Sequence, residues 1–276
     1  MTFIVTLIGL LIERFFDWSH LRHWGWYSKY ERKVLARLPN LSPYAVLAVT
    51  VLPLVIVVII VQFLLQGLMY GLLSLLFQLF LFLYCLGPQN LWADAFSSIN
   101  SLGKSDSAAG DKLKASFGVS AGDAGQIHRQ LLDGIFIQAN IRVFAVIFWY
   151  ALLGPAGIVL YRLVCLSSDS EEVSPKLAQS AQMAEDVLNW LPAKLLTVLF
   201  ALGGNFGHVI TCWRKKMTFS LSGSDQLIAD CGLAAIGKED QDVIAQDGAI
   251  ARSAISLLDR VFVITLVLVL LYSLLV

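Results

Sequence analysis

The feature that most constrains this chain is a run of 43 residues, from Tyr44 to Leu86, that contains no charged side chain. Its strongly polar members are Gln62, Gln66 and Gln78. A helix needs about 20 apolar residues to cross a bilayer, so the run is too long for one span and predicts two. Gln66-Gly67 to Gly71 is the expected hairpin, and Gly87-Pro88 should end the second helix.

The composition points to the same class of protein. Hydrophobic residues make up 57% of the chain and charged residues 14%, against about 45–50% and about 25% in soluble domains. This excludes an ordinary soluble protein and a disordered one. Because 20 basic residues balance 20 acidic ones, no strongly basic face is available for nucleic acid. We therefore predict an all-α, polytopic helical membrane protein with four to five long spans, a short N-terminal apolar helix and cytoplasmic helical loops.

Alternating apolar and polar stretches predict eight segments. They are an N-terminal apolar helix with a basic and aromatic interfacial segment (1–43), a transmembrane hairpin (44–86), a cytoplasmic polar segment (87–139), a third span (140–166), an outer amphipathic helix (167–190), a fourth span (191–213), a cytoplasmic segment (214–254) and a C-terminal span (255–276). Ser42-Pro43 and Ser174-Pro175 predict helix starts, with Ser as N-cap and Pro at the first helical position. Gly154-Pro155 should kink the third span. Whether residues 1–14 cross the membrane is left open.

The distribution of Lys and Arg gives an expected orientation. Segments 1–43, 87–142 and 212–260 hold 17 of these residues, whereas Arg162, Lys176 and Lys194 are the other three. Cytoplasmic loops carry the excess of basic residues. We therefore expect the three basic segments in the cytoplasm and the acidic segment 167–190 outside.

Motifs of familiar enzyme chemistry are absent from the sequence. It contains no P-loop, no His-Glu-x-x-His, no Gly-x-Ser-x-Gly and no closely spaced cysteine pair, and it does not identify a cofactor. The cysteines (Cys85, Cys165, Cys212 and Cys231) are expected to be small buried hydrophobes. Gly203-Gly204-Asn205-Phe206-Gly207 is expected to permit close helix packing rather than to bind phosphate.

Charged side chains follow the N-terminal apolar run. Glu13, Asp17 and His20 could line one side of a helix, and carboxylates with imidazole could hold a cation or a phosphate-bound metal. The alternative is a solvated interfacial segment in which His20 and His23 bind nothing. Our predicted site residues from this region are Glu13 and Arg14, without a metal site.

A second group of candidates lies where the third span meets the cytoplasmic face. Polar groups at a bilayer are costly and often functional, which favours Asn140 and Arg142 as ligand-binding residues. Arg142 with Arg14 would make a fixed anion site, and Glu13 would bind a cation or an amine. The alternative is that Arg142 snorkels to the interface.

A third group surrounds Pro192. Asp186, Trp190 and Lys194 are predicted to bind a ligand, and the alternative is a capped helix end with an aromatic anchor. Because these residues are expected at the outer end of the fourth span, one pocket could join them to the cytoplasmic candidates only if it runs deep.

Two elements carry a resemblance to a known family. The first is Phe148-Trp149-Tyr150 followed by Gly154-Pro155, and the second is Asp186-Val-Leu-Asn189-Trp190-Leu-Pro192-Ala-Lys194. Their order resembles the AmpE/CobD–CbiB family of bacterial inner-membrane proteins, which share a Phe-Trp span and an Asn/Asp-Trp-x-Pro-x-Arg/Lys element. The apolar run into Glu13-Arg14, and Asn140-x-Arg142, look closer to the AmpE branch.

Each branch implies a different function. The AmpE branch implies a signalling modulator linked to β-lactamase induction and the cell-wall response, encoded beside the cell-wall amidase AmpD. The CobD/CbiB branch implies a membrane enzyme that makes adenosylcobinamide phosphate. That branch carries a Glu-Asn-Thr-Ser-Asp-type element where this chain has Gln138-Ala-Asn140-Ile-Arg142, without the carboxylates.

Three functions are therefore open. The first is an AmpE-like regulator in a bacterial inner membrane that binds a ligand or partner at a membrane-face pocket. The second is a membrane ligase or transferase of the CobD/CbiB type, acting on an amphiphilic substrate. The third is a transporter, disfavoured because the span interiors carry almost no charge. Membrane lipids, and a protein partner from cell-wall recycling, are the expected partners.

Overall fold

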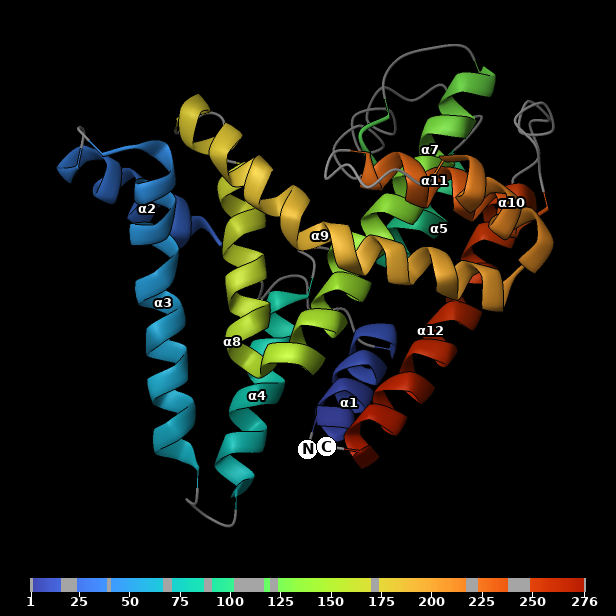
Figure 1. The fold of residues 1–276 in the computed structure, drawn as a ribbon. Coiled ribbons are helices and arrows are strands. Elements are labelled where there is room, and N and C mark those ends of the chain that lie inside the picture. Colours follow the sequence, from blue (N-terminus) through green and yellow to red (C-terminus); the bar gives the residue numbers. More distant parts are fainter. Residues whose placement is uncertain are drawn as a thin grey trace. The chain divides into compact units, whose positions relative to one another are not determined.

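Long apolar helices dominate the computed structural model of this chain (Figure 1). The structure describes residues 2–15, 24–38, 41–66, 71–86, 91–101, 117–119, 124–169, 174–216, 223–237 and 249–275, and within them it contains no strand. Helices long and apolar enough to cross a membrane cover Pro43–Leu65, Gly125–Ser168, Pro175–Gly203 and Ile250–Leu275. This confirms the predicted all-α membrane class.

The chain forms two units, and the segments that build them alternate along the sequence. The first unit comprises Met1–Pro88, Ala145–Asn189 and Leu275–Val276, and the second comprises Gln89–Phe144 and Trp190–Leu274. The helices of the first unit are α1 (Thr2–Phe15), α2 (Gly25–Arg37), α3 (Pro43–Leu65), α4 (Leu72–Cys85), α8 (Ala145–Ser168) and the first half of α9 (Pro175–Gly203).

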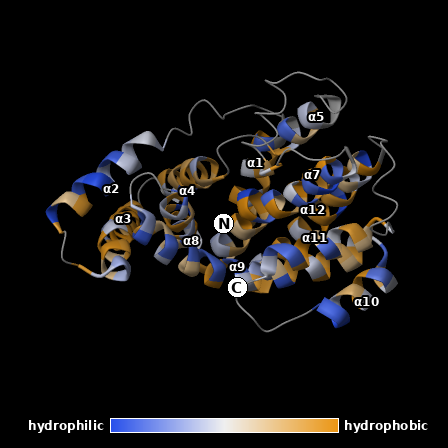
Figure 2. Ribbon diagram, turned by 90° about the horizontal axis from the view of Figure 1, so that it is seen from above, coloured by the Kyte–Doolittle hydropathy of each residue, from blue (hydrophilic) through white to orange (hydrophobic). Residues whose placement is uncertain are grey.

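The uncharged run forms two helices, α3 and α4, as predicted. Ser42 caps α3, because its Oγ accepts a hydrogen bond from the backbone N–H of Ala45 at 3.3 Å. Figure 2, in which α3 is seen end-on, shows mostly orange turns in α3, whereas α2 contains blue hydrophilic turns. Gln78 of α4 accepts a hydrogen bond of 2.8 Å from the hydroxyl of Tyr150 in α8, so this polar residue binds α4 to α8. The predicted ends at Gly67 and Gly87-Pro88 lie outside the described residues.

Gly154 divides α8 into two helical parts. Its φ of 67° and ψ of −152° are non-helical and belong to a region that glycine alone adopts readily. Pro155 follows and cannot donate the next backbone hydrogen bond. The kink predicted at Gly154-Pro155 is therefore confirmed.

Pro192 lies inside α9 and does not begin a new helix, although the sequence separated an amphipathic helix from a fourth span at this point. Proline lacks an N–H, so the carbonyl of Leu188, four residues earlier, loses its helical partner. The indole Nε1 of Trp149 in α8 donates a hydrogen bond of 3.3 Å to that carbonyl. This hydrogen bond replaces the missing backbone bond, and α9 continues as one helix from Pro175 to Gly203.

Helices of the second unit are α5 (Leu91–Ser101), α7 (Ala124–Ala139), the π-helix η3 (Asn140–Phe144), the second half of α9, α10 (Phe206–Lys216), α11 (Ser224–Ala235) and α12 (Ala249–Leu275). A Cβ on Gly204 would lie 2.5 Å from the carbonyl oxygen of Ala235, so glycine is needed where α9 ends against α11. The backbone N–H of Asn205 donates to the same oxygen at 2.8 Å. This supports the predicted packing role of the glycine-rich stretch.

The role of Trp149 can be tested by removing its donor. Trp149→Phe should destabilise the protein by about 1–3 kcal/mol, because it leaves the Leu188 carbonyl without a partner. Pro192→Ala restores a backbone N–H for that carbonyl, so Trp149→Phe should cost less in the Pro192→Ala background. Thermal unfolding in detergent measures both effects.

Trp190→Phe is the matched control, because the buried indole Nε1 of Trp190 makes no hydrogen bond. Equal costs of Trp149→Phe in the wild-type and Pro192→Ala backgrounds would contradict this account of the helix.

Candidate functional site

A pocket of about 460 Å³ lies at the end of α8 and beside the first turns of α9, within the first unit. It is lined by Ser168, Pro175, Ala178, Gln179, Gln182 and Met183. Ser174 fixes the start of α9, because its Oγ accepts a hydrogen bond from the backbone N–H of Leu177 at 3.4 Å. This confirms the helix start that Ser174-Pro175 predicted. The volume falls in the range of small-molecule sites.

A buried polar cluster backs the pocket. The hydroxyl of Ser168 donates a hydrogen bond to the carboxylate of Glu185. Asn189 donates to the other oxygen of that carboxylate at 3.4 Å and accepts a bond of 2.8 Å from the hydroxyl of Tyr161. All four side chains are buried. Because a buried carboxylate must be compensated by donors, these bonds fix Ser168 at the pocket wall.

Sequence reasoning missed Ser168 and Glu185. The segment expected to be an amphipathic outer helix (167–190) has a buried apolar side in α9, which includes Leu177 and Ala181. A stripe of buried residues at helical spacing instead continues from Ala178 and Ala181 to Glu185 and Asn189. A carboxylate seven residues after Ala178 and four after Ala181 was the available signal, because it places a charge on the buried face of the helix, where a compensating donor is needed.

Three side-chain bonds define which segments share one end of the first unit. Trp26 Nε1 donates to the hydroxyl of Tyr84 at the end of α4 (2.9 Å). The hydroxyls of Tyr27 and Ser167 lie 2.8 Å apart. The Tyr44 hydroxyl lies 3.0 Å from Met183 Sδ in the pocket wall. Burial raises the pKa of Tyr27 to about 12, so its hydroxyl is neutral at physiological pH.

These contacts bear on the expected orientation. Segments 1–43 and 167–190 were assigned to opposite membrane faces, which a hydrocarbon core about 30 Å thick would separate. Hydrogen bonds instead join α2 and the start of α3 to the end of α8 and the start of α9. The break at Gly154 provides the physical reason, because α8 is not one straight helix across the bilayer.

The predicted residues around Pro192 occupy consecutive turns of α9. Gln182 Nε2 donates to the carboxylate of Asp186 at 3.4 Å, so Asp186 lies one turn beyond the pocket wall. The ammonium of Lys194 lies 3.5 Å from the centroid of the Trp190 ring, a cation–π contact. Asp186 is therefore a neighbour of the pocket, and its predicted ligand-binding role, like those of Trp190 and Lys194, stays a prediction.

The predicted N-terminal residues belong to α1. Glu13 is buried in the first unit. Arg14 lies in the same helix, but its side chain, like Asp17, His20 and His23, lies outside the described residues. Within the described residues, no three His, Cys, Asp or Glu side chains gather as metal ligands would.

Asn140 and Arg142 lie in the π-helix η3 of the second unit. The Arg142 guanidinium donates to Asp94 Oδ2 at 2.9 Å and to Gln138 Oε1 at 2.8 Å, and it lies 5.9 Å from the centroid of the Phe117 ring. The Asp94 carboxylate thus neutralises part of the Arg142 charge that was expected to bind an anion. The amide of Asn140 is fully buried without a hydrogen-bond partner. Such π-helical turns occur often at functional sites.

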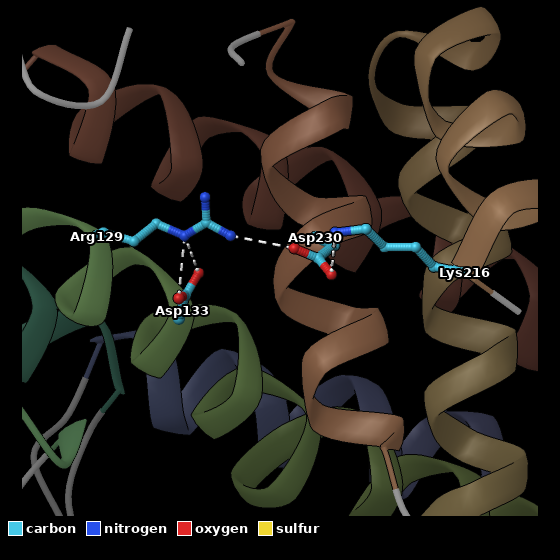
Figure 3. Close-up of polar contacts among 4 residues, drawn as sticks. All are labelled: Arg129, Asp133, Lys216 and Asp230. Carbon is cyan, nitrogen blue, oxygen red and sulfur yellow. Dashed lines mark hydrogen bonds and ion pairs between the residues drawn. The ribbon is translucent and has the colours of Figure 1, made fainter. Parts of the chain in front are cut away.

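A second charged cluster joins three helices of the second unit (Figure 3). Arg129 of α7 contacts Asp133 at 3.0 Å and Asp230 of α11 at 3.1 Å. Lys216, at the end of α10, contacts the other oxygen of Asp230 at 2.7 Å. Asp230 is the buried member, with a side chain 7% exposed, whereas Lys216 is 49% exposed. Two cations therefore compensate one buried carboxylate and hold α7, α10 and α11 together.

Comparisons with known proteins identify relatives of the chain. A family model described as "Regulatory signalling modulator protein AmpE" matches residues 1–276. Two proteins named "Cobalamin biosynthesis protein CobD" are more distantly similar. The one from Stutzerimonas stutzeri is 27% identical over 115 residues, or 40% of this chain, and the one from Chromobacterium violaceum is 28% identical over 119 residues, or 42% of this chain. The matched region spans 38% of each CobD protein. No solved structure matches the chain.

The charged cluster predicts unequal effects for its two cations. Arg129→Ala should destabilise the protein by about 1–3 kcal/mol, because it removes the less exposed partner of a buried carboxylate. Lys216→Ala should cost about 1 kcal/mol or less, because Lys216 is half exposed. Thermal unfolding at low salt measures the difference. Arg252→Ala, an exposed arginine of α12, is the control. Equal effects of Arg129→Ala and Lys216→Ala would refute the ranking.

Proposed function

The chain belongs to the AmpE family of regulatory signalling modulator proteins, and we propose that it regulates by binding a ligand in the pocket at Ser168 and α9. The regulated response is β-lactamase induction and the handling of cell-wall stress, in the inner membrane of a bacterium. The observation that carries the proposal is the pocket itself, whose wall residue Ser168 is fixed by the buried carboxylate of Glu185.

One helix offers a route from ligand to response. The first two turns of α9 line the pocket, and the same helix continues past Pro192 to Gly203 in the second unit. A ligand that favours one position of the helix start shifts the population of positions of the whole helix, because a hydrogen-bonded helix moves largely as a rigid rod. Trp190 and Lys194 lie along this route, beyond the pocket, and contact each other within the helix.

We propose that the pocket opens on the cytoplasmic face. The bonds of Ser167 to Tyr27 and of Met183 to Tyr44 support this, because α2 carries the basic and aromatic residues typical of that face. Lys176, which the charge count left on the opposite side, then joins the basic residues of segment 1–43. Glu13 is buried near the end of α1, so membrane lipids or a cell-wall-recycling protein would contact exposed residues of segment 1–43 such as Lys33 instead.

A second function is favoured by a specific observation. Both CobD relatives are named for cobalamin biosynthesis, and Asn140 is a fully buried amide without a partner, two residues before Arg142. Asn140, Arg142 and Asp94 could bind an amphiphilic substrate in a transferase of the CobD/CbiB type. Binding of a corrinoid that Arg142→Ala abolishes, followed by absorbance, would favour this alternative over ligand-controlled regulation.

The regulatory proposal predicts a phenotype for pocket variants. In cells lacking the native gene, Ser168→Ala and Asp186→Asn should change β-lactamase induction by a β-lactam to the level of the deletion. The physical reason is the loss of the fixed hydroxyl or of the carboxylate that orients Gln182. Nitrocefin hydrolysis measures induction, and immunoblots check protein level.

Asp225→Asn neutralises an exposed carboxylate of α11, outside the pocket, and should leave induction unchanged. Wild-type induction in both pocket variants would rule out the proposed site.

The side of the membrane is tested by cysteine labelling. In a Cys212→Ser background, which removes the half-buried native thiol, Gln179→Cys and Lys33→Cys should react with an impermeant maleimide in inverted vesicles. Burial raises the pKa of Cys231, so that thiol stays protonated and adds little background. Gln66→Cys, at the opposite end of α3, should react in intact spheroplasts. If Gln179→Cys reacts as Gln66→Cys does, the pocket opens on the outer face.

A further inference from the structure

We infer that the pocket takes a ligand whose binding group is a hydrogen-bond donor with positive charge, a primary ammonium. The inference rests on the proposed ligand-binding function and adds the chemical class of the ligand. It follows from how the polar groups of the pocket wall use their own hydrogens.

Ser168 presents only an acceptor to the pocket. Its Oγ lies within hydrogen-bond distance of the carboxylate of Glu185 and, at 2.9 Å, of the backbone carbonyl of Cys165. A hydroxyl has one hydrogen and two lone pairs. Neither Glu185 nor Cys165 lines the pocket, and the hydroxyl hydrogen is used by one of them, so the Ser168 oxygen has only lone pairs left for a ligand.

The side-chain amide of Gln182 is also oriented by a carboxylate, that of Asp186. Its Nε2 donates to Asp186 Oδ1 at 3.4 Å, which fixes the nitrogen toward the carboxylate and leaves the amide oxygen with both acceptor positions. One N–H of the amide also remains. Gln179, the third polar residue of the wall, carries amide donors as well as an amide oxygen. Acidic neighbours thus consume donors from two of the three polar wall residues.

The charge around the pocket favours a cation. Glu185 and Asp186 stand behind its wall, and Asp169 follows Ser168 in the chain. Two cations are also near. Arg162 is buried in α8 and interacts electrostatically with Asp169, so it offsets part of this charge, and Lys176 is an exposed residue of α9. None of these charged side chains lines the pocket itself, and the three carboxylates outnumber the two cations. An ammonium supplies three donors and a charge that these acceptors and carboxylates stabilise. A carboxylate or phosphate ligand would meet lone pairs and like charge.

The test compares three four-carbon probes that differ in charge. They are 1,4-diaminobutane, 1,4-butanediol and succinate. Each is titrated by ligand-observed NMR against the full-length protein in nanodiscs of neutral phosphatidylcholine, with empty nanodiscs as the blank. The diamine should bind at least about tenfold more tightly than the diol, because a charge-assisted hydrogen bond is worth roughly twice a neutral one. Succinate should not bind.

Two variants assign the binding to this pocket. Asp186→Asn keeps the shape of the side chain, and Ser168→Ala removes the acceptor oxygen. Each should weaken diamine binding about tenfold. Asp225→Asn is the matched neutralisation elsewhere and should not change it. If either pocket variant unfolds, as circular dichroism would reveal, the other still decides the question.

The outcomes separate the inference from the function it rests on. Binding of succinate or the diol in preference to the diamine, lost in Ser168→Ala, would overturn the ammonium class and leave the ligand pocket standing. Diamine binding that is equal in all variants would overturn the assignment to this pocket. If no probe binds and Ser168→Ala also leaves β-lactamase induction unchanged, the inference and the proposed function both fail.

Discussion

The hydrogen bond from the Trp149 indole to the carbonyl of Leu188 is the interaction on which the rest of α9 depends. A proline inside a helix leaves one carbonyl without its partner, and in hydrocarbon no water can replace that partner. Trp149 supplies the donor from a different helix. This gives a physical meaning to the sequence elements that resemble the AmpE/CobD–CbiB family, because the tryptophan of the first element compensates the proline of the second. The part of the pocket wall from Pro175 to Met183, Glu185 and the Trp190–Lys194 contact all lie on the helix that this bond keeps continuous.

The break at Gly154 has the second largest consequence. A straight α8 would separate its two ends by the thickness of a bilayer. The segment before α8 and the segment after it would then lie on opposite faces. The observed bonds of Ser167 and Met183 to Tyr27 and Tyr44 bring the end of α8 and the start of α9 to the aromatic end of α2 and α3. The position of the pocket therefore depends on a single residue whose backbone conformation only glycine tolerates easily.

Both units use the same electrostatic solution for buried charge. In the first unit, Ser168 and Asn189 donate to Glu185, and in the second unit Arg129 and Lys216 flank Asp230. Arg142 is likewise held by Asp94. These interactions serve structure first, because an uncompensated charge in an apolar interior is very costly. Ser168, a member of the first of these networks, also lines a pocket.

Much of the architecture was readable in the residue order. The uncharged run of residues 44–86 requires two helices, serine before proline starts α3 and α9, and Gly154-Pro155 interrupts α8, because all of these follow from local backbone chemistry and bilayer thickness. The site role that the sequence predicted for Asp186 stays a prediction, although this residue lies one turn from Gln182 of the pocket wall. Tertiary structure alone decided the rest. The packing of α8 against α9 brought Trp149 to Leu188, so the helix continues through Pro192 where the sequence predicted a boundary. The packing of α2 against α8 brought Tyr27 to Ser167, and the distribution of charges along the chain did not predict this contact. Ser168 and Glu185 form a pair across two helices, and their meeting depends on how those helices pack rather than on any spacing along the chain.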